Sequence, residues 1–251
     1  MTKVAIVTGG NRGIGFAIVK GLAKVFDGDV FLTARNKERG LAAVKALESE
    51  GLKVRFHLLD IDDVQSNVNL ANFLKETYGG LDILVNNAGI AFKCASTEPV
   101  HVQAKVTINT NYYGVKKTCD ALFPLLRDGA RVVNVSSSCG FLNKIPGKDL
   151  KARFAANDLT VKQLDELMED FITATEKGKH GELGWPGSTY MVSKVGLSAL
   201  TRLQQRDMDA KKKLSDVAIN HIHPGYVDTG TQVHLYTDWS LSDALYILLQ
   251  I

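Results

Sequence analysis

The chain has 251 residues, of which 45% are hydrophobic and 23% are charged, as in an ordinary soluble globular protein. A net charge of +3 is too small to indicate a nucleic-acid partner, and no apolar run is long enough to span a membrane. The three cysteines have neither CxxC spacing nor a metal-ligand pattern, which favours a reducing compartment without a metal site. Since a strand pattern begins at Val4 and leaves no room for a signal peptide, we expect a cytoplasmic protein.

The first third of the chain alternates short apolar runs, expected to be strands, with amphipathic helical patterns. The expected strands cover residues 4–8, 30–33, 54–59 and 83–85. The expected helices cover 14–26, 36–50 and 64–78, with inward faces that include Val25, Leu41 and Val68. This alternation predicts a parallel sheet with helices on both faces.

The second part of the chain continues the pattern with longer elements. We expect a long helix over about 100–126, a strand over 131–135, a helix from Tyr190 to about Lys213 and a sixth strand over 217–222. Ser240 is a plausible cap for a last helix over 241–251. The order of elements predicts one doubly wound Rossmann-type α/β domain over residues 1–251, with a mainly parallel sheet of six strands, or seven if another follows.

One segment, residues 141–189, interrupts this rhythm just before the Tyr190 helix. Thr160 and Gln163 form the pattern of a capping box, and an apolar stripe at helical spacing follows them. We therefore expect an inserted helical region of two helices packed on the main body.

The first turn, from Thr8 to Gly15, has the form TGxxxGxG. Glycines let the backbone turn sharply and approach a pyrophosphate, which the following helix N-terminus attracts. A plain strand-helix connector is the alternative, but the position directly after the first strand favours a dinucleotide site.

The end of the second strand bears on the choice of cofactor. An NAD site usually has an acidic residue there to hold the ribose hydroxyls, whereas this strand ends in Arg35 with no acid before Glu38. Arg35 and Arg12 suit a 2′-phosphate, because a guanidinium matches phosphate oxygens. The sequence therefore predicts NADPH rather than NADH.

Polar residues follow the later strands. Asp60, with Ile61 beside it, can take an adenine amino group or cap a helix. The asparagines of residues 86–89 can line a cofactor or tie strands together. Serines at 136–138 can bind a carbonyl oxygen or form a turn, and the Pro-Gly within 223–229 indicates only a turn by itself.

Tyr190 and Lys194 are four residues apart on the expected helix and share a face. A nearby ammonium favours the ionised form of a phenol, so we expect Lys194 to lower the pKa of Tyr190. Such a tyrosine can exchange a proton with a substrate oxygen. The pair alone is weak evidence, because this spacing occurs by chance on solvated helices.

Together these motifs, TGxxxGxG, NNAG, SSxxG, YxxxK and PGxVxT, resemble those of the short-chain dehydrogenase/reductase family over residues 3 to about 229. The chain is most similar to the monomeric NADPH-dependent carbonyl reductases of that family, which share its long insertion ending in GWPGSTYMVSK. The resemblance implies the reduction of ketones, aldehydes or quinones by NADPH, in a monomer without nucleic-acid or membrane partners. A cofactor-binding sensor or scaffold of the same fold is the alternative function.

The resemblance also implies roles for individual residues. Tyr190 would donate a proton, Lys194 would assist it, Ser137 would bind the substrate oxygen, and Asn111 would hold a water in a relay to Lys194. Besides Tyr190 and Lys194, the implied cofactor-binding residues are Gly9, Asn11, Arg12, Gly13, Ile14, Gly15, Arg35, Asp60, Ile61, Asn87, Ala88, Gly89, Val135, Pro224, Gly225, Val227 and Thr229. Candidates for the substrate pocket are His221, His223, Tyr226, Cys139 and Trp185.

Overall fold

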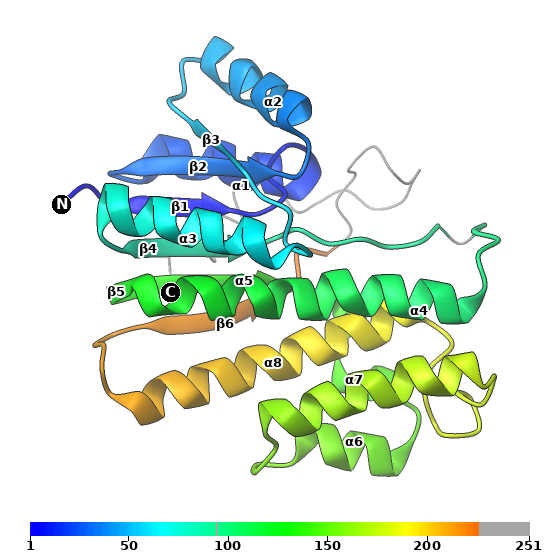
Figure 1. Ribbon diagram of the computed structural model, residues 1–251. Coiled ribbons are helices and arrows are strands. Elements are labelled where there is room, and N and C mark those ends of the chain that lie inside the picture. The colour runs from blue at the N-terminus through cyan, green and yellow to red at the C-terminus, as the bar shows by residue number, and fades with distance from the viewer. Residues whose placement is uncertain (94, 226–251) are drawn as a thin grey trace.

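The computed structural model describes residues 1–93 and 95–225 (Figure 1). In this part of the chain six parallel strands form one sheet, as the sequence predicted, and their order is β3-β2-β1-β4-β5-β6. The strands are β1 (Val4–Val7), β2 (Asp29–Ala34), β3 (Arg55–Leu58), β4 (Leu81–Asn86), β5 (Leu126–Val135) and β6 (Ala218–Ile222). The predicted helix over 241–251 and any seventh strand lie outside the described residues.

Helices cover both faces of the sheet (Figure 1). Because side chains alternate along a strand, Val4 and Ile6 of β1 enter one core and Ala5 and Val7 enter the other. The first core contains α3 (Val64–Tyr78) and α5 (Val115–Leu122), and the second contains α1 (Gly13–Val25) and α2 (Lys37–Ser49).

Three of the expected inward positions are wrong. Val25, the last residue of α1, is 54% exposed, and Leu41 and Val68 also face outward. In α2 the close approach occurs at Gly40, where a Cβ would lie 2.0 Å from the ring of Phe56, and this turns Leu41 away from the sheet. In α3, Leu74 is buried as expected, but Asn67 takes the inward place expected for Val68 and bonds to the backbone of Ile61 and Asp63.

The expected helix over 100–126 contains a wide turn that the sequence did not indicate. The region consists of four elements in succession: α4 (Val100–Ile108), a π-helical segment (Asn109–Gly114), α5, and a 3₁₀ turn (Phe123–Leu125) that contains Pro124. The π-helical segment is the wide turn, here called the π turn. β5 then begins five residues earlier than expected. The early part of β5 is irregular. Gly129 has a left-handed backbone conformation, and the register between β4 and β5 shifts between Leu81 and Ile83.

The inserted region forms the two helices that the sequence predicted, α6 (Lys148–Ala155) and α7 (Val161–Glu176). Both hydrogen bonds of the Thr160–Gln163 capping box are present at the start of α7. α7 lies against α4 and α8 (Thr189–Lys211) and builds a separate core with them (Figure 1). Trp185, a candidate for the substrate pocket, is buried in that core beside Phe171.

Among the helices within residues 1–93 and 95–225, none is both long and apolar enough to cross a bilayer. The same part of the chain holds no cluster of three or more His, Cys, Asp or Glu side chains suited to a metal ion.

Candidate active site

The glycine turn between β1 and α1 leaves no room for a side chain at Gly9 or at Gly15. Gly9 has a φ of +63°, and a Cβ there would lie 3.0 Å from Ala88. A Cβ on Gly15 would lie 2.4 Å from Nδ2 of Asn87 and 2.5 Å from the carbonyl oxygen of Gly9. α1 begins at Gly13 without a side-chain cap and without an acidic residue in its first turn. Its first N–H groups therefore suit an anion such as a pyrophosphate.

The NNAG segment after β4 supports this turn. Nδ2 of Asn87 donates to the carbonyl oxygens of Thr8 (2.9 Å) and Gly9 (3.2 Å), and the amides of Asn87 and Ala88 donate to Oγ1 of Thr8. Asn86 instead bonds to Asn134 of β5 at 2.8 Å. The alternative that these asparagines tie strands together is thus confirmed for Asn86.

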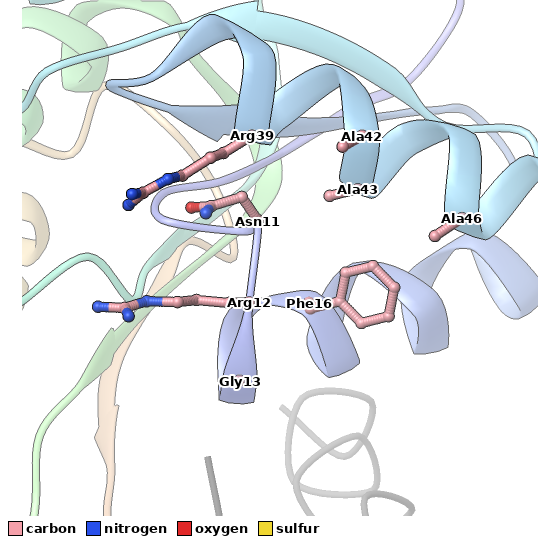
Figure 2. A pocket seen from close by; sticks show the side chains of 8 residues that line it. All are labelled: Asn11, Arg12, Gly13, Phe16, Arg39, Ala42, Ala43 and Ala46. Atoms are coloured by element: carbon pink, nitrogen blue, oxygen red, sulfur yellow. The ribbon is translucent and has the colours of Figure 1, made fainter. Parts of the chain in front are cut away.

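A pocket between α1 and α2 has a cationic rim (Figure 2). The side chains of Arg12 and Arg39 extend in the same direction, with the amide of Asn11 between them (Figure 2). Within residues 1–93 and 95–225, no carboxylate forms an ion pair with either arginine. The pocket, here the α1–α2 pocket, is lined by Asn11, Arg12, Gly13, Phe16, Arg39, Ala42, Ala43 and Ala46.

Arg39 is a residue that the sequence analysis missed. Asn36 caps α2 by accepting from the amide of Arg39, which fixes this arginine in the first turn of the helix, beside the pocket. Arg35, which was expected to pair with Arg12, is exposed and does not line the pocket. The signal that indicates Arg39 is the Asn36 cap, which shows where the helix begins.

Asp60 and Ile61 follow β3. Oδ1 of Asp60 accepts from the amide of Asp62, while Asp63 caps α3 by accepting from Gln65. Ile61 is 6% exposed, and its side chain belongs to the core. A ligand beside this residue therefore meets its backbone rather than its side chain.

Lys194 reaches the end of β5. Its Nζ donates to the carbonyl oxygen of Val135 at 2.7 Å and lies 5.6 Å from the centre of the Tyr190 ring. The side chain is buried, which lowers the pKa of Lys194 to about 8. Lys194 is thus an ammonium that gives up its proton far more easily than a solvated lysine.

Of the three serines after β5, Ser137 is the one that meets Tyr190. Its side chain is the polar neighbour that lowers the pKa of the Tyr190 phenol against the larger effect of burial, and Oγ of Ser137 accepts from the amide of Cys139 at 3.2 Å. Ser136 is buried and faces α8, where it bonds to Ser198 at 2.9 Å, and Ser138 is exposed.

The expectation that Lys194 lowers the pKa of Tyr190 is wrong for this structure. Burial raises the pKa of Tyr190 and outweighs the opposing effect of Ser137. The ammonium of Lys194 instead bonds to Val135, and its own charge is disfavoured by burial. Tyr190 therefore holds its proton at neutral pH, as a proton donor must.

Asn111 lies in the π turn and is fully buried. Its Oδ1 accepts from the amide of Ile90 at 2.8 Å, and its Nδ2 donates to the carbonyl oxygen of Ile90 and to Oγ of Ser193. A Cβ on Gly89 would lie 3.1 Å from Oδ1 of Asn111 and 3.8 Å from Nζ of Lys194. Asn111 and Lys194 thus face the same glycine. Both amide hydrogens of Asn111 are used by the protein, so a water could bond only to an oxygen of this residue.

Ser193 also escaped the sequence analysis. Its hydroxyl donates to the carbonyl oxygen of Tyr190 at 2.8 Å and accepts from Asn111 at 3.0 Å, so it joins the tyrosine helix to the π turn. Because it lies three residues after Tyr190, helical spacing is the signal that indicates it.

His223 closes the other side of the site. Its imidazole packs edge-on against Phe141, and burial lowers the pKa of His223. Cys139 is half-buried beside Tyr190, whereas His221 is more exposed. Pro224 and Gly225 follow His223, while Tyr226, Val227 and Thr229 lie outside the described residues.

The sequence profile of the short chain dehydrogenase family matches residues 3–174. Carbonyl reductase [NADPH] 1 of Homo sapiens is 48% identical over 227 residues, which are 90% of this chain and 82% of that protein. Carbonyl reductase [NADPH] 3 of Rattus norvegicus is 47% identical over 230 residues, which are 91% of this chain and 83% of that protein.

Solved structures show the same similarity. Menthone neomenthol reductase from Mentha piperita has a TM-score of 0.79 and 34% identity, over 89% of this chain and 90% of that one. Salutaridine reductase from Papaver somniferum has a TM-score of 0.82 and 30% identity, over 93% of this chain and 90% of that one.

Proposed function

The chain belongs to the short-chain dehydrogenase/reductase family, and from this premise we propose that it reduces carbonyl compounds to alcohols with NADPH. The observation that carries the proposal is the convergence of Tyr190, Ser137 and Lys194 at the end of β5. A buried phenol that keeps its proton, beside a serine hydroxyl, is suited to a carbonyl oxygen. Ketones, aldehydes and quinones are the proposed substrates.

The residues present fit NADPH. The glycine turn and the start of α1 suit the pyrophosphate, and Arg12, Arg39 and Asn11 suit the 2′-phosphate. The ribose and nicotinamide would lie along the NNAG segment, Val135 and Lys194, toward Pro224 and Gly225. When bound, NADPH supplies a hydride for the carbonyl carbon.

The protein's own residues would supply the proton and hold the substrate. Ser137 and Tyr190 donate hydrogen bonds to the carbonyl oxygen, and Tyr190 then transfers its proton to it. Lys194 lies 5.6 Å from the centre of the ring and, because burial lowers its pKa to about 8, can return a proton to the tyrosinate that results. An oxygen of Asn111 would accept a hydrogen bond from a water. That water would lie on the path by which protons pass from solvent to Lys194.

Following NADPH absorbance with a panel of quinones, diketones and aromatic aldehydes tests this function. Turnover with at least one class, lost in Tyr190→Phe, supports the reductase. Tight NADPH binding without turnover for the whole panel would favour a sensor or scaffold and contradict the proposal. Tyr190→Phe keeps the ring, so its NADPH affinity reports whether the variant is folded.

We also propose that the protein is a monomer built as one domain in a reducing compartment such as the cytoplasm. Three features support this: α7 covers faces of α4 and α8, its side chains share their core, and Cys119 and Cys139 are free thiols. Light scattering that gives a mass near 27.4 kDa would support the monomer, and twice that mass would contradict it.

A further inference from the structure

The π turn that carries Asn111 is held by side chains from several elements. Oγ1 of Thr110 donates to Asp62 at 2.8 Å, from the loop after β3. Asn111 bonds to Ile90 and Ser193, as described above. The next two residues, Tyr112 and Tyr113, bond to the inserted helix α7. Four consecutive residues of one turn thus have side-chain partners outside it.

The contact with α7 begins at a buried tyrosine. Tyr112 is 0% exposed, and its hydroxyl donates to Oδ1 of Asp165 at 2.8 Å. Burial raises the pKa of Tyr112 far above its usual value, so its hydroxyl remains a donor. The other oxygen of Asp165 lies 3.6 Å from Nζ of Lys116, which balances the charge of the carboxylate.

The second tyrosine repeats the contact one helical turn along α7. The hydroxyl of Tyr113 donates to Oε1 of Glu169 at 2.7 Å, and the two tyrosine rings pack edge to face with their centres 5.0 Å apart. Asp165 and Glu169 are four residues apart, so they occupy one face of α7. α7 therefore presents two carboxylates to the π turn, and each accepts a hydrogen bond from one of the two tyrosines.

A wide turn of this kind needs such support. A π segment is rare and departs from regular helix geometry, and it persists where surrounding structure holds it, often at functional sites. Asn111 contributes to the site only if its backbone stays in register with Lys194 and Gly89. A small displacement of groups in an active site reduces the rate strongly.

We propose that α7 is a positioning element of the active site, which holds Asn111 in place through the bonds of Tyr112 to Asp165 and Tyr113 to Glu169. Tyr112, Tyr113, Asp165 and Glu169 are its positioning residues. This inference rests on the proposed reductase function. It gives the insertion a role in the reaction in addition to covering α4 and α8.

The test removes the hydroxyl and keeps the ring. For Tyr112→Phe, we expect kcat to fall about tenfold, the effect of one lost buried hydrogen bond, with KM for NADPH unchanged. Asp165→Asn keeps an acceptor for Tyr112 and should retain most of the rate. Asp165→Ala removes that acceptor and should match Tyr112→Phe.

Asp170→Asn is the matched control, because Asp170 is exposed on the same helix and pairs only with Arg153 among the described residues. Its kcat should equal that of the wild type. Amide hydrogen exchange over residues 109–114 should accelerate in Tyr112→Phe and stay unchanged in Asp170→Asn.

Two results would overturn the inference. One is a kcat within twofold of the wild type in folded, NADPH-binding Tyr112→Phe, and the other is an equal loss in Asp165→Asn and Asp165→Ala. A wild type that turns over no carbonyl contradicts the proposed function instead. Unchanged exchange at residues 109–114 would then still refute the positioning of the π turn.

Discussion

The two ends of the site hold their functional groups in different ways. On the β1–β2 side, the expected cofactor contacts are backbone amides of the glycine turn and arginines with no acidic partner in the described structure. On the β4–β5 side, hydrogen bonds within the protein hold three side chains: Asn111 bonds to Ile90 and Ser193, Ser137 to the amide of Cys139, and Lys194 to Val135 of β5. The first side is open to a ligand, and the second is organised before any ligand arrives.

This difference indicates which kinetic quantity a substitution on each side should change. Exposed arginines contribute charge-assisted bonds that form only with the cofactor, so their loss should appear in NADPH affinity. Preorganised donors act on charge that develops during the reaction, so their loss should appear in kcat. Each prediction below tests one side against the other.

The largest effect is expected for Tyr190→Phe, which removes the proposed proton donor. We expect kcat to fall by about 10²–10⁴-fold, the usual contribution of a general acid. NADPH affinity, measured by fluorescence quenching, should change little because the ring remains. An unchanged kcat would contradict the proposed mechanism.

Ser137→Ala should have the next largest effect. Loss of one donor to the developing oxyanion typically lowers kcat by about 10²–10³-fold. Ser138→Ala is the control, because Ser138 is the exposed neighbour. Equal rates in the two variants would show that Ser137 does not bind the reacting oxygen.

On the cofactor side, Arg39→Ala should raise KM for NADPH about 10- to 100-fold, the effect of one charge-assisted bond. The kcat at saturating NADPH and the KM for NADH should stay near wild type. Lys45→Ala removes an exposed positive charge from the same helix without touching the α1–α2 pocket. If both variants weaken NADPH equally, general charge rather than a phosphate site is responsible.

The smallest effect concerns stability. Burial lowers the pKa of Lys194 to about 8 from its usual 10.5. Between these values the unfolded chain holds a proton that the folded chain lacks, so stability rises with pH, by at most about 1.4 kcal/mol per pH unit. In urea unfolding of the cofactor-free protein, the wild type should gain stability relative to Lys194→Met across this window. A difference that stays constant with pH would contradict the burial of Lys194.

Much of the fold was predictable because it rests on local patterns. Strand and helix alternation gave the parallel sheet, and the Thr160–Gln163 pair gave the start of α7. The π turn was not predictable, because residues 109–114 continue the helical pattern and are distinguished by tertiary contacts, with Asp62, Ile90, Ser193 and α7.

The site shows the same division. The glycine turn follows from residue spacing, since only glycine fits where a Cβ would meet Asn87. The pKa of Tyr190 does not, because burial outweighs the lysine four residues away. Arg39 was missed because its place at the pocket depends on how α2 packs beside α1, which sequence spacing alone does not give.

A double-mutant cycle tests the separation of the two sides most directly. kcat/KM would be measured for the wild type, Arg39→Ala, Ser137→Ala and the double variant, with one carbonyl substrate and varied NADPH. The two sites share no side-chain partner in the described structure, so we predict that the free-energy effects add to within about 0.5 kcal/mol. A coupling above about 1 kcal/mol would show that cofactor capture and proton transfer are not separate, and would contradict this account.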